Sequence, residues 1–380
     1  DADDILFTAS YGLTKIPHEF ETYDAFTPDL LAWVRVPEIS AAGDTYIYVY
    51  YGNSTTASQE DAEAVWDDDY RGVFHLSEDG TSSSYDDASG TIDGAFGGGG
   101  TTDSDAPTRV PGAVGFAQQF DDDDGATEDT NIRVPNWPIT GTGFTVSAWF
   151  SLYNLNEDWC IVSKTNGSGT GGSWWLIGIE GQGLATSRPF RMRIKTDDGG
   201  ANDGTLTLAS PTNNVDQNTL YYGTAVYDGA QASLYLDGDF VTSAAKTGDM
   251  TGDLDGAGAI PATPPQVNIG TGYNGDRPTP GIIDDVRVST VARSADWIKT
   301  QFLMQRQSSQ GAPAFLGVPD TSKFVKQIDP QQTYAAYTYR RTLTINKDKV
   351  EGFSNHRDFP ILVNVTLDPS KVESENGYDI

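Results

Sequence analysis

Apolar residues recur at every second position in most segments of this chain that show any periodicity. In residues 44–51, Tyr46, Tyr48 and Tyr50 fall on one side and the apolar residues between them on the other. A period of two is that of a β-strand, whose successive side chains point to opposite faces. Similar alternation at 30–36, 145–150 and 359–367 predicts an all-β protein.

Turn and helix signals agree with that fold class. Asp237-Gly238 lies between two apolar runs and predicts a β-hairpin over residues 234–241. Only one segment favours a helix, which Ser294 can cap and which runs from Ala295 to about Arg306. The stretches 79–106 and 196–218 are rich in Gly, Ser, Thr, Asn and Asp and predict loops.

Length and charge limit the classes of function. The 380 residues suit two domains, and residues 307–333, with three prolines, predict a connection between them. The net charge of −30 argues against a nucleic-acid partner, because phosphate repels such a surface. No apolar run reaches the roughly 18 residues of a membrane span, so we expect no membrane insertion. The single cysteine, Cys160, is expected to be buried on a strand.

Short segments of the long middle region follow one another in a familiar order. They are residues 72–76, 144–149, 161–164, 225–229, 234–238, 281–288 and 292–298. In this order and spacing they resemble the laminin-G-like, concanavalin-A-like jelly-roll domains. The resemblance implies a jelly-roll β-sandwich over about 66–318, in an extracellular or cell-surface protein.

The two ends of the chain carry a second resemblance. Segments 339–345 and 359–363, followed by 4–8, 31–37 and 47–53, resemble the domain of unknown function DUF2341. In this chain the order is circularly split, so that 334–380 holds the first half, 1–57 holds the second half, and 319–333 is a linker. This smaller β-sandwich is completed either by 1–57 of a neighbouring repeat or subunit, which we expect, or by the chain's own two ends in a circular permutant.

An enzymatic role is not expected. Glycoside hydrolysis needs two carboxylates on either side of the scissile bond. Glucanases of the jelly-roll fold carry a Glu-x-Asp-x-x-Glu run on one strand, and this sequence has none. The nearest acidic pair, Glu19 and Glu21, lies outside the jelly-roll region and is expected to share a solvent face.

Calcium is the expected cofactor, in a structural role. Residues 86–94 resemble a cation-binding loop of related jelly rolls, which implies Asp86 and Asp93 as ligands beside Asp284 of the last strand. Residues 121–129 form a second acidic cluster. The alternative is that these aspartates form turns and carry solvated charge.

Ligand-binding and glycosylation sites are also suggested. Trp174 and Trp175 lie on one strand, so one ring is expected to face solvent and stack on a sugar. Arg191 and Arg193 form a basic patch for an anionic glycan or an acidic neighbour, or else pair with acids across the sheet. Three sequons give candidate glycosylation sites at Asn53, Asn166 and Asn364.

Two functions follow as expectations. The first is a non-catalytic extracellular structural or adhesive module, one repeat or subunit of a head-to-tail cell-surface fibre or giant adhesin, with neighbouring copies as partners. The second is a carbohydrate-binding module of a secreted or surface protein. The split domain favours the first function, and the jelly roll favours the second.

Overall fold

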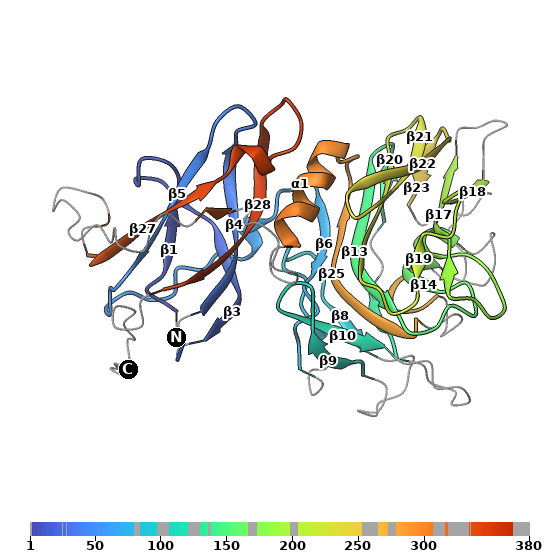
Figure 1. The fold of residues 1–380 in the computed structure, drawn as a ribbon, viewed down its shortest axis with the longest axis horizontal. Coiled ribbons are helices and arrows are strands. Elements are labelled where there is room, and N and C mark those ends of the chain that lie inside the picture. The colour runs from blue at the N-terminus through green and yellow to red at the C-terminus, as the bar shows by residue number, and fades with distance from the viewer. Residues whose placement is uncertain are drawn as a thin grey trace. The chain divides into compact units, whose positions relative to one another are not determined.

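The computed structural model divides the chain into two compact units (Figure 1). Unit 1 contains Asp1–Asp67 and Lys299–Ile380, and unit 2 contains Asp68–Ile298. The residues described are 2–24, 26–27, 29–79, 84–96, 106–120, 130–135, 138–165, 173–197, 204–252, 265–272, 279–306, 316–317, 334 and 336–367. Among them, no helix has the length and apolar character to cross a membrane.

Unit 2 is an antiparallel β-sandwich, as the alternation predicts. Its first sheet has the order β22 (Asp239–Ala245), β21 (Gln231–Leu236), β20 (Tyr221–Tyr227), β13 (Phe144–Leu152), β25 (Gly281–Ser289), β10 (Phe116–Phe120) and β9 (Thr108–Pro111), with β6 (Tyr70–Phe74) also paired to β25. The second has the order β12 (Thr140–Gly141), β23 (Asp249–Thr251), β17 (Phe190–Asp197), β15 (Ser173–Ile179), β14 (Cys160–Thr165), β24 (Gln266–Ile269), β11 (Ile132–Val134), β8 (Gly94–Phe96) and β7 (Ser84–Tyr85), with β18 (Gly204–Ala209) also paired to β17. A short ribbon joins β16 (Ser187–Arg188) to β19 (Val215–Asp216).

The core of unit 2 lies between its two sheets. Alternate residues of β13, among them Val146, Ala148 and Phe150, point into it and are buried. Cys160 is buried on β14, which confirms that prediction. The hairpin of β21 and β22 is also confirmed, since Asp237 and Gly238 both adopt the positive φ that a tight two-residue turn requires.

Unit 1 is a smaller sandwich. One sheet has the order β2 (Lys15–Ile16), β1 (Leu6–Thr8), β5 (Thr45–Tyr51), β27 (Tyr339–Ile345) and β26 (Leu316–Gly317). The other has the order β28 (His356–Thr366), β4 (Asp29–Ile39) and β3 (His18–Asp24). Two short 3-10 turns, η1 (Glu63–Val65) and η4 (Lys347–Lys349), also belong to unit 1.

Both ends of the chain build unit 1. Strand β27 pairs with β5 along its whole length, and β28 pairs with β4, so the red C-terminal strands lie beside blue N-terminal ones in Figure 1. The apolar face of β28, Ile361, Val363 and Val365, is thereby buried. Within this chain the partner strands thus come from the chain itself, as in the circular-permutant alternative, and pairing with a neighbouring copy stays a prediction.

The helix α1 (Ala295–Gln305) is confirmed with its cap, because the backbone N–H of Trp297 donates to the Ser294 hydroxyl at 3.2 Å. The unit boundary falls within this helix, so the jelly-roll unit ends near 298 and not near 318. The reason is tertiary contact: Thr300 is hydrogen-bonded to the backbone N–H of Glu351 at 2.9 Å, and Met304 lies 3.0 Å from the N–H of Leu362.

Candidate functional site

The two tryptophans expected to bind sugar are both buried. Trp174 is 3% exposed and Trp175 is 1% exposed. The ring of Trp175 lies in the sandwich core, 5.2 Å from that of Phe144. Trp174 points the other way, but the ammonium group of Lys195 lies 4.6 Å from its ring. The expected exposed stacking ring on β15 is therefore wrong, because alternation along a strand does not show what covers its outer face.

The arginines of β17 are engaged within unit 2. Arg191 is 1% exposed, and its guanidinium lies 2.9 Å from the carboxylate of Asp158. Arg193 is half-buried and donates to the Thr207 hydroxyl at 3.2 Å. Arg191 thus forms an internal ion pair and does not belong to an open basic patch.

The aspartates implied as calcium ligands are not gathered into one cluster. Asp86 and Asp93 are exposed in the loop between β7 and β8, where Asp87 accepts the backbone N–H groups of Val73 and Ser89. Asp284 is buried on β25 and accepts the N–H of Val114 at 2.9 Å. Within the described ranges, no three His, Cys, Asp or Glu side chains are grouped to hold a metal ion. Residues 121–129 lie outside those ranges, and calcium binding stays a prediction.

The three sequons lie in different settings. Asn53 is half-buried and accepts the Thr55 hydroxyl at 3.0 Å, and Asn364 is exposed on β28. Asn166 lies outside the described residues. Glycosylation stays a prediction.

The acidic pair of β3 is covered, contrary to expectation. Glu19 is 7% exposed and accepts the indole N–H of Trp66 at 2.9 Å. Glu21 accepts the indole N–H of Trp33 at 3.2 Å, and the two tryptophan rings lie 5.6 Å apart. The indole of Trp66, which follows η1, covers Glu19, while Glu21 stays half-buried, so the packing of this pair favours a structural role.

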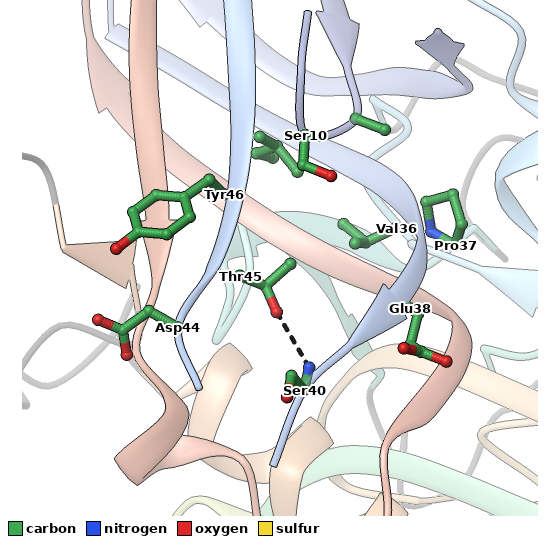
Figure 2. A pocket seen from close by; sticks show the side chains of 10 residues that line it. Ser10, Val36, Pro37, Glu38, Ser40, Asp44, Thr45 and Tyr46 are labelled. Carbon is green, nitrogen blue, oxygen red and sulfur yellow. Dashed lines mark hydrogen bonds between the residues drawn. The ribbon is translucent and has the colours of Figure 1, made fainter. Parts of the chain in front are cut away.

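A cleft opens between the two sheets of unit 1, and it is our candidate binding site (Figure 2). Its volume is about 320 Å³. Three segments line it: Ala9 and Ser10 after β1, the end of β4 with Ser40, and the start of β5 with Asp44. Figure 2 shows Ser10, Val36 and Thr45 directed toward its centre, while the Tyr46 ring points away from them.

Hydrogen bonds fix the shape of the cleft. The backbone N–H of Ser40 donates to the Thr45 hydroxyl at 3.0 Å, which ties β4 to β5 at the bottom of the site. Asp44 accepts the N–H of Lys347 at 3.0 Å, and Glu38 accepts the side-chain amide of Asn355 at the same distance. The lining combines hydroxyl and carboxylate oxygens with the apolar residues Val36, Pro37 and Ile47.

Sequence reasoning did not identify this cleft. Its residues come from three separate segments, and none of them carries a motif with a fixed spacing. The local signal is a turn between β4 and β5 at residues 40–44, which contains Ser40, Gly43 and Asp44.

Two family matches accord with the resemblances seen in the sequence. Residues 124–299 match the concanavalin A-like lectin/glucanases superfamily, and residues 1–140 match DUF2341, a domain of unknown function. The second match does not include residues 334–380. A search of curated proteins found no match.

Solved structures with partial similarity include the binding domain of Paraclostridial Mosquitocidal Protein 1, at 15% identity and a TM-score of 0.43 over 62% of this chain and 52% of that one. This chain thus spans about half of that domain's length. Domain 4 of the arabinanase AbnA from Geobacillus stearothermophilus gives 14% identity and a TM-score of 0.39 over 60% of this chain and 96% of that one. The CBM40 domain of a Ruminococcus gnavus sialidase gives 17% identity and a TM-score of 0.33 over 42% of this chain and 83% of that one.

Proposed function

Because residues 124–299 match the concanavalin A-like lectin/glucanases superfamily, we propose that the chain is a non-catalytic glycan-binding module of an extracellular or cell-surface protein. The observation that carries the proposal is the cleft of unit 1. Its hydroxyl and carboxylate oxygens suit the hydroxyl groups of a sugar, and its apolar lining residues suit the C–H face of a sugar ring.

The acidic side chains favour binding over hydrolysis. In unit 2, Asp158 and Asp285 are paired with arginines, and Asp284 accepts a backbone N–H. In unit 1, Glu19 and Glu21 accept indole N–H groups. A pair of carboxylates that flank a glycosidic bond would need access to it, and these five groups are committed to contacts within the protein. The two carboxylates of the cleft, Glu38 and Asp44, accept the Asn355 amide and the Lys347 N–H.

Filling the cleft is expected to abolish glycan binding. Ser10 is exposed and lines the site, so Ser10→Trp places a large ring in the cleft without burying a polar group. We expect at least about a tenfold loss of affinity, as for loss of a central contact, in calorimetry with whichever glycan the wild-type chain retains on a glycan array.

The control is Leu184→Trp, an equally large change at a residue of unit 2 that is 93% exposed. It should bind as the wild type does. A wild-type chain that retains no glycan on a broad array, or a Ser10→Trp variant with unchanged affinity, would contradict the proposal.

The second candidate function is a structural repeat of a head-to-tail fibre or adhesin. This function is favoured because strands from both ends of the chain build unit 1. The registers that join β27 to β5 and β28 to β4 within one chain can also form between copies. This requires the segment that carries β27 and β28 to leave its own chain's strands and to pair with those of a neighbour.

A disulfide between paired positions distinguishes the closed chain from the fibre. Tyr46 and Thr344 face each other across β5 and β27, so Tyr46→Cys and Thr344→Cys, with Cys160→Ser, place one thiol on each strand. Because unit 1 is closed within one chain, we expect the oxidised protein to run as a monomer on a non-reducing gel. A ladder of multimers that grows with protein concentration would support the fibre instead.

A further inference from the structure

The sheet that contains β5 carries tyrosines on the face directed away from the other sheet of unit 1. Phe7 of β1 faces inward, with its ring 5.1 Å from that of His18 on β3, so the next residue, Thr8, faces outward. Thr8 pairs with Tyr48 of β5, which places Tyr48 on the outer face as well. Tyr46 shares that face by alternation, and Figure 2 shows its ring directed away from the cleft. The outer face is therefore separate from the cleft.

An arginine is held over these tyrosines. Arg340 of β27 pairs with Tyr50, and its guanidinium carbon lies 4.8 Å from the ring centre of Tyr48 and 5.9 Å from that of Tyr50. The Tyr50 hydroxyl donates to the carbonyl of Gly12 at 3.1 Å, which fixes this ring in place. Contacts with two aromatic rings position the guanidinium against the sheet while its N–H fork remains able to bind a planar anion.

No carboxylate of the described residues neutralises this arginine. Its guanidinium forms no ion pair or hydrogen bond with them, whereas Arg191 and Arg287 are each paired with an aspartate. Lys15 of β2 lies on the same face by its register with β1, is exposed, and donates to the side-chain oxygen of Gln59 at 3.1 Å. Two cations without a carboxylate partner thus share one face, in a chain with 54 acidic and 24 basic residues.

Hydroxyl groups and one exposed ring complete this surface. Across β5 and β27, Thr342 opposes Tyr48 and Thr344 opposes Tyr46, whose side chain is 45% exposed. Asp44, two residues before Tyr46, lies at the end of this surface. We call the surface the outer tyrosine face and define it by Lys15, Tyr46, Tyr48, Arg340, Thr342 and Thr344.

We infer that the outer tyrosine face is a second ligand site, which binds an acidic polysaccharide. Sugar carboxylates would pair with Arg340 and Lys15, because a guanidinium fork matches a carboxylate in shape and charge. A sugar ring would stack on Tyr46, whose exposed ring suits the C–H face of a sugar. Since Tyr46 and Tyr48 are about 7 Å apart along the strand, the ligand spans more than one sugar.

This inference goes beyond the proposed function, because the two sites differ in place and in charge. The residues that line the cleft include Glu38 and Asp44 and no basic side chain, so the cleft disfavours an acidic sugar. The net charge of −30 repels a polyanion at long range, but charges more than about 8 Å away are largely screened at physiological ionic strength. The cations of the outer tyrosine face therefore decide the preference at contact.

The test uses the full chain at physiological ionic strength, with affinity electrophoresis and calorimetry as readouts. Polygalacturonate and alginate are the acidic probes, and a neutral glucan is the comparison. We expect Arg340→Met to weaken binding of the acidic polymers at least about tenfold, and Lys15→Met and Tyr46→Ala at least about threefold each. Methionine retains an unbranched stem on the tyrosine rings, and the exposed position of Tyr46 keeps the test valid if Arg340→Met does not fold.

Two controls separate this site from general effects of charge and shape. Arg109→Met removes the same charge from an exposed arginine of unit 2 whose guanidinium lies 4.6 Å from the ring centre of Phe116, and it should change the affinity for polygalacturonate less than about twofold. Tyr46→Phe keeps the ring and should bind as the wild type does. Ser10→Trp fills the cleft and should leave acidic-polymer binding intact.

The outcomes distinguish this inference from the proposed function. Acidic-polymer affinity that is unchanged in both Arg340→Met and Tyr46→Ala, or that is lost in Ser10→Trp, overturns the inference alone. Polyglutamate bound as tightly as polygalacturonate also overturns it, because the face would then accept any polyanion, including an acidic protein. A chain that binds acidic polymers through Arg340, but whose neutral-glycan binding is unaffected by Ser10→Trp, supports the inference and overturns the proposed role of the cleft.

Discussion

Arg287→Met is expected to lower the free energy of unfolding of unit 2 by about 3–5 kcal/mol, because it leaves the buried carboxylate of Asp285 without its cation. Both residues lie on β25 and are almost completely buried, with one guanidinium nitrogen 2.8 Å from a carboxylate oxygen. His75 lies 3.4 Å from the same carboxylate. Burial alone would raise the pKa of Asp285, but Arg287 and His75 hold that pKa below its ordinary value, so the charge persists in the folded unit.

Denaturant unfolding at pH 7, followed by hydrogen exchange of β13 and β25, measures this loss. The double variant Asp285→Asn with Arg287→Met removes both charges and should recover much of it, and asparagine tolerates the positive φ of 48° at position 285. Arg357→Met is the control, since that arginine pairs with Glu38 at 81% side-chain exposure and should cost less than about 1 kcal/mol. A similar small loss for Arg287→Met would show that the buried pair is not needed for stability.

Acidification is expected to destabilise unit 1 through His18. The side chain is fully buried on β3, with its ring 5.1 Å from that of Phe7 and 5.2 Å from that of Phe20. Burial, with a smaller effect of Lys15, lowers the pKa of His18 to about 4, and backbone groups of Ile16 and Ile5 offset part of this. The folded unit therefore holds the neutral ring, whereas the unfolded chain takes up a proton near the ordinary value of about 6.5.

The direction of the stability change and its pH range follow from the difference between the folded and unfolded pKa values of His18. As pH falls from about 6.5 to about 4, only the unfolded chain binds the proton, so the free energy of unfolding falls by up to about 3 kcal/mol and then levels off. His18→Phe removes this dependence on pH. Hydrogen exchange of β3 and β4 at pH 7 and pH 4 measures the free energy of unfolding of wild type and variant. The difference between the two proteins separates the contribution of His18 from that of the carboxylates. Parallel pH profiles for the two proteins would contradict the assignment.

The local sequence determined the secondary structure of this chain to a large extent. The strand of residues 44–51, the Asp237-Gly238 hairpin and the helix after Ser294 form where their patterns predict. Each depends on interactions between residues close in sequence: alternation along one strand, positive φ in a two-residue turn, and a side-chain cap on a helix. The order of short segments likewise sufficed to recognise the two domains.

Tertiary structure decided which side chains are covered, which strands pair and where a cleft forms. Whether Trp174 is exposed depends on the side chain of Lys195, and whether Glu19 meets solvent depends on Trp66, 47 positions further along the chain. The pairing of β27 with β5 joins residues at opposite ends of the sequence, and the cleft exists only where Ser10, Ser40 and Thr45 converge. A strand's apolar face requires burial but does not specify its partner, so the sequence alone left open both the closure of unit 1 within one chain and the site that this closure forms.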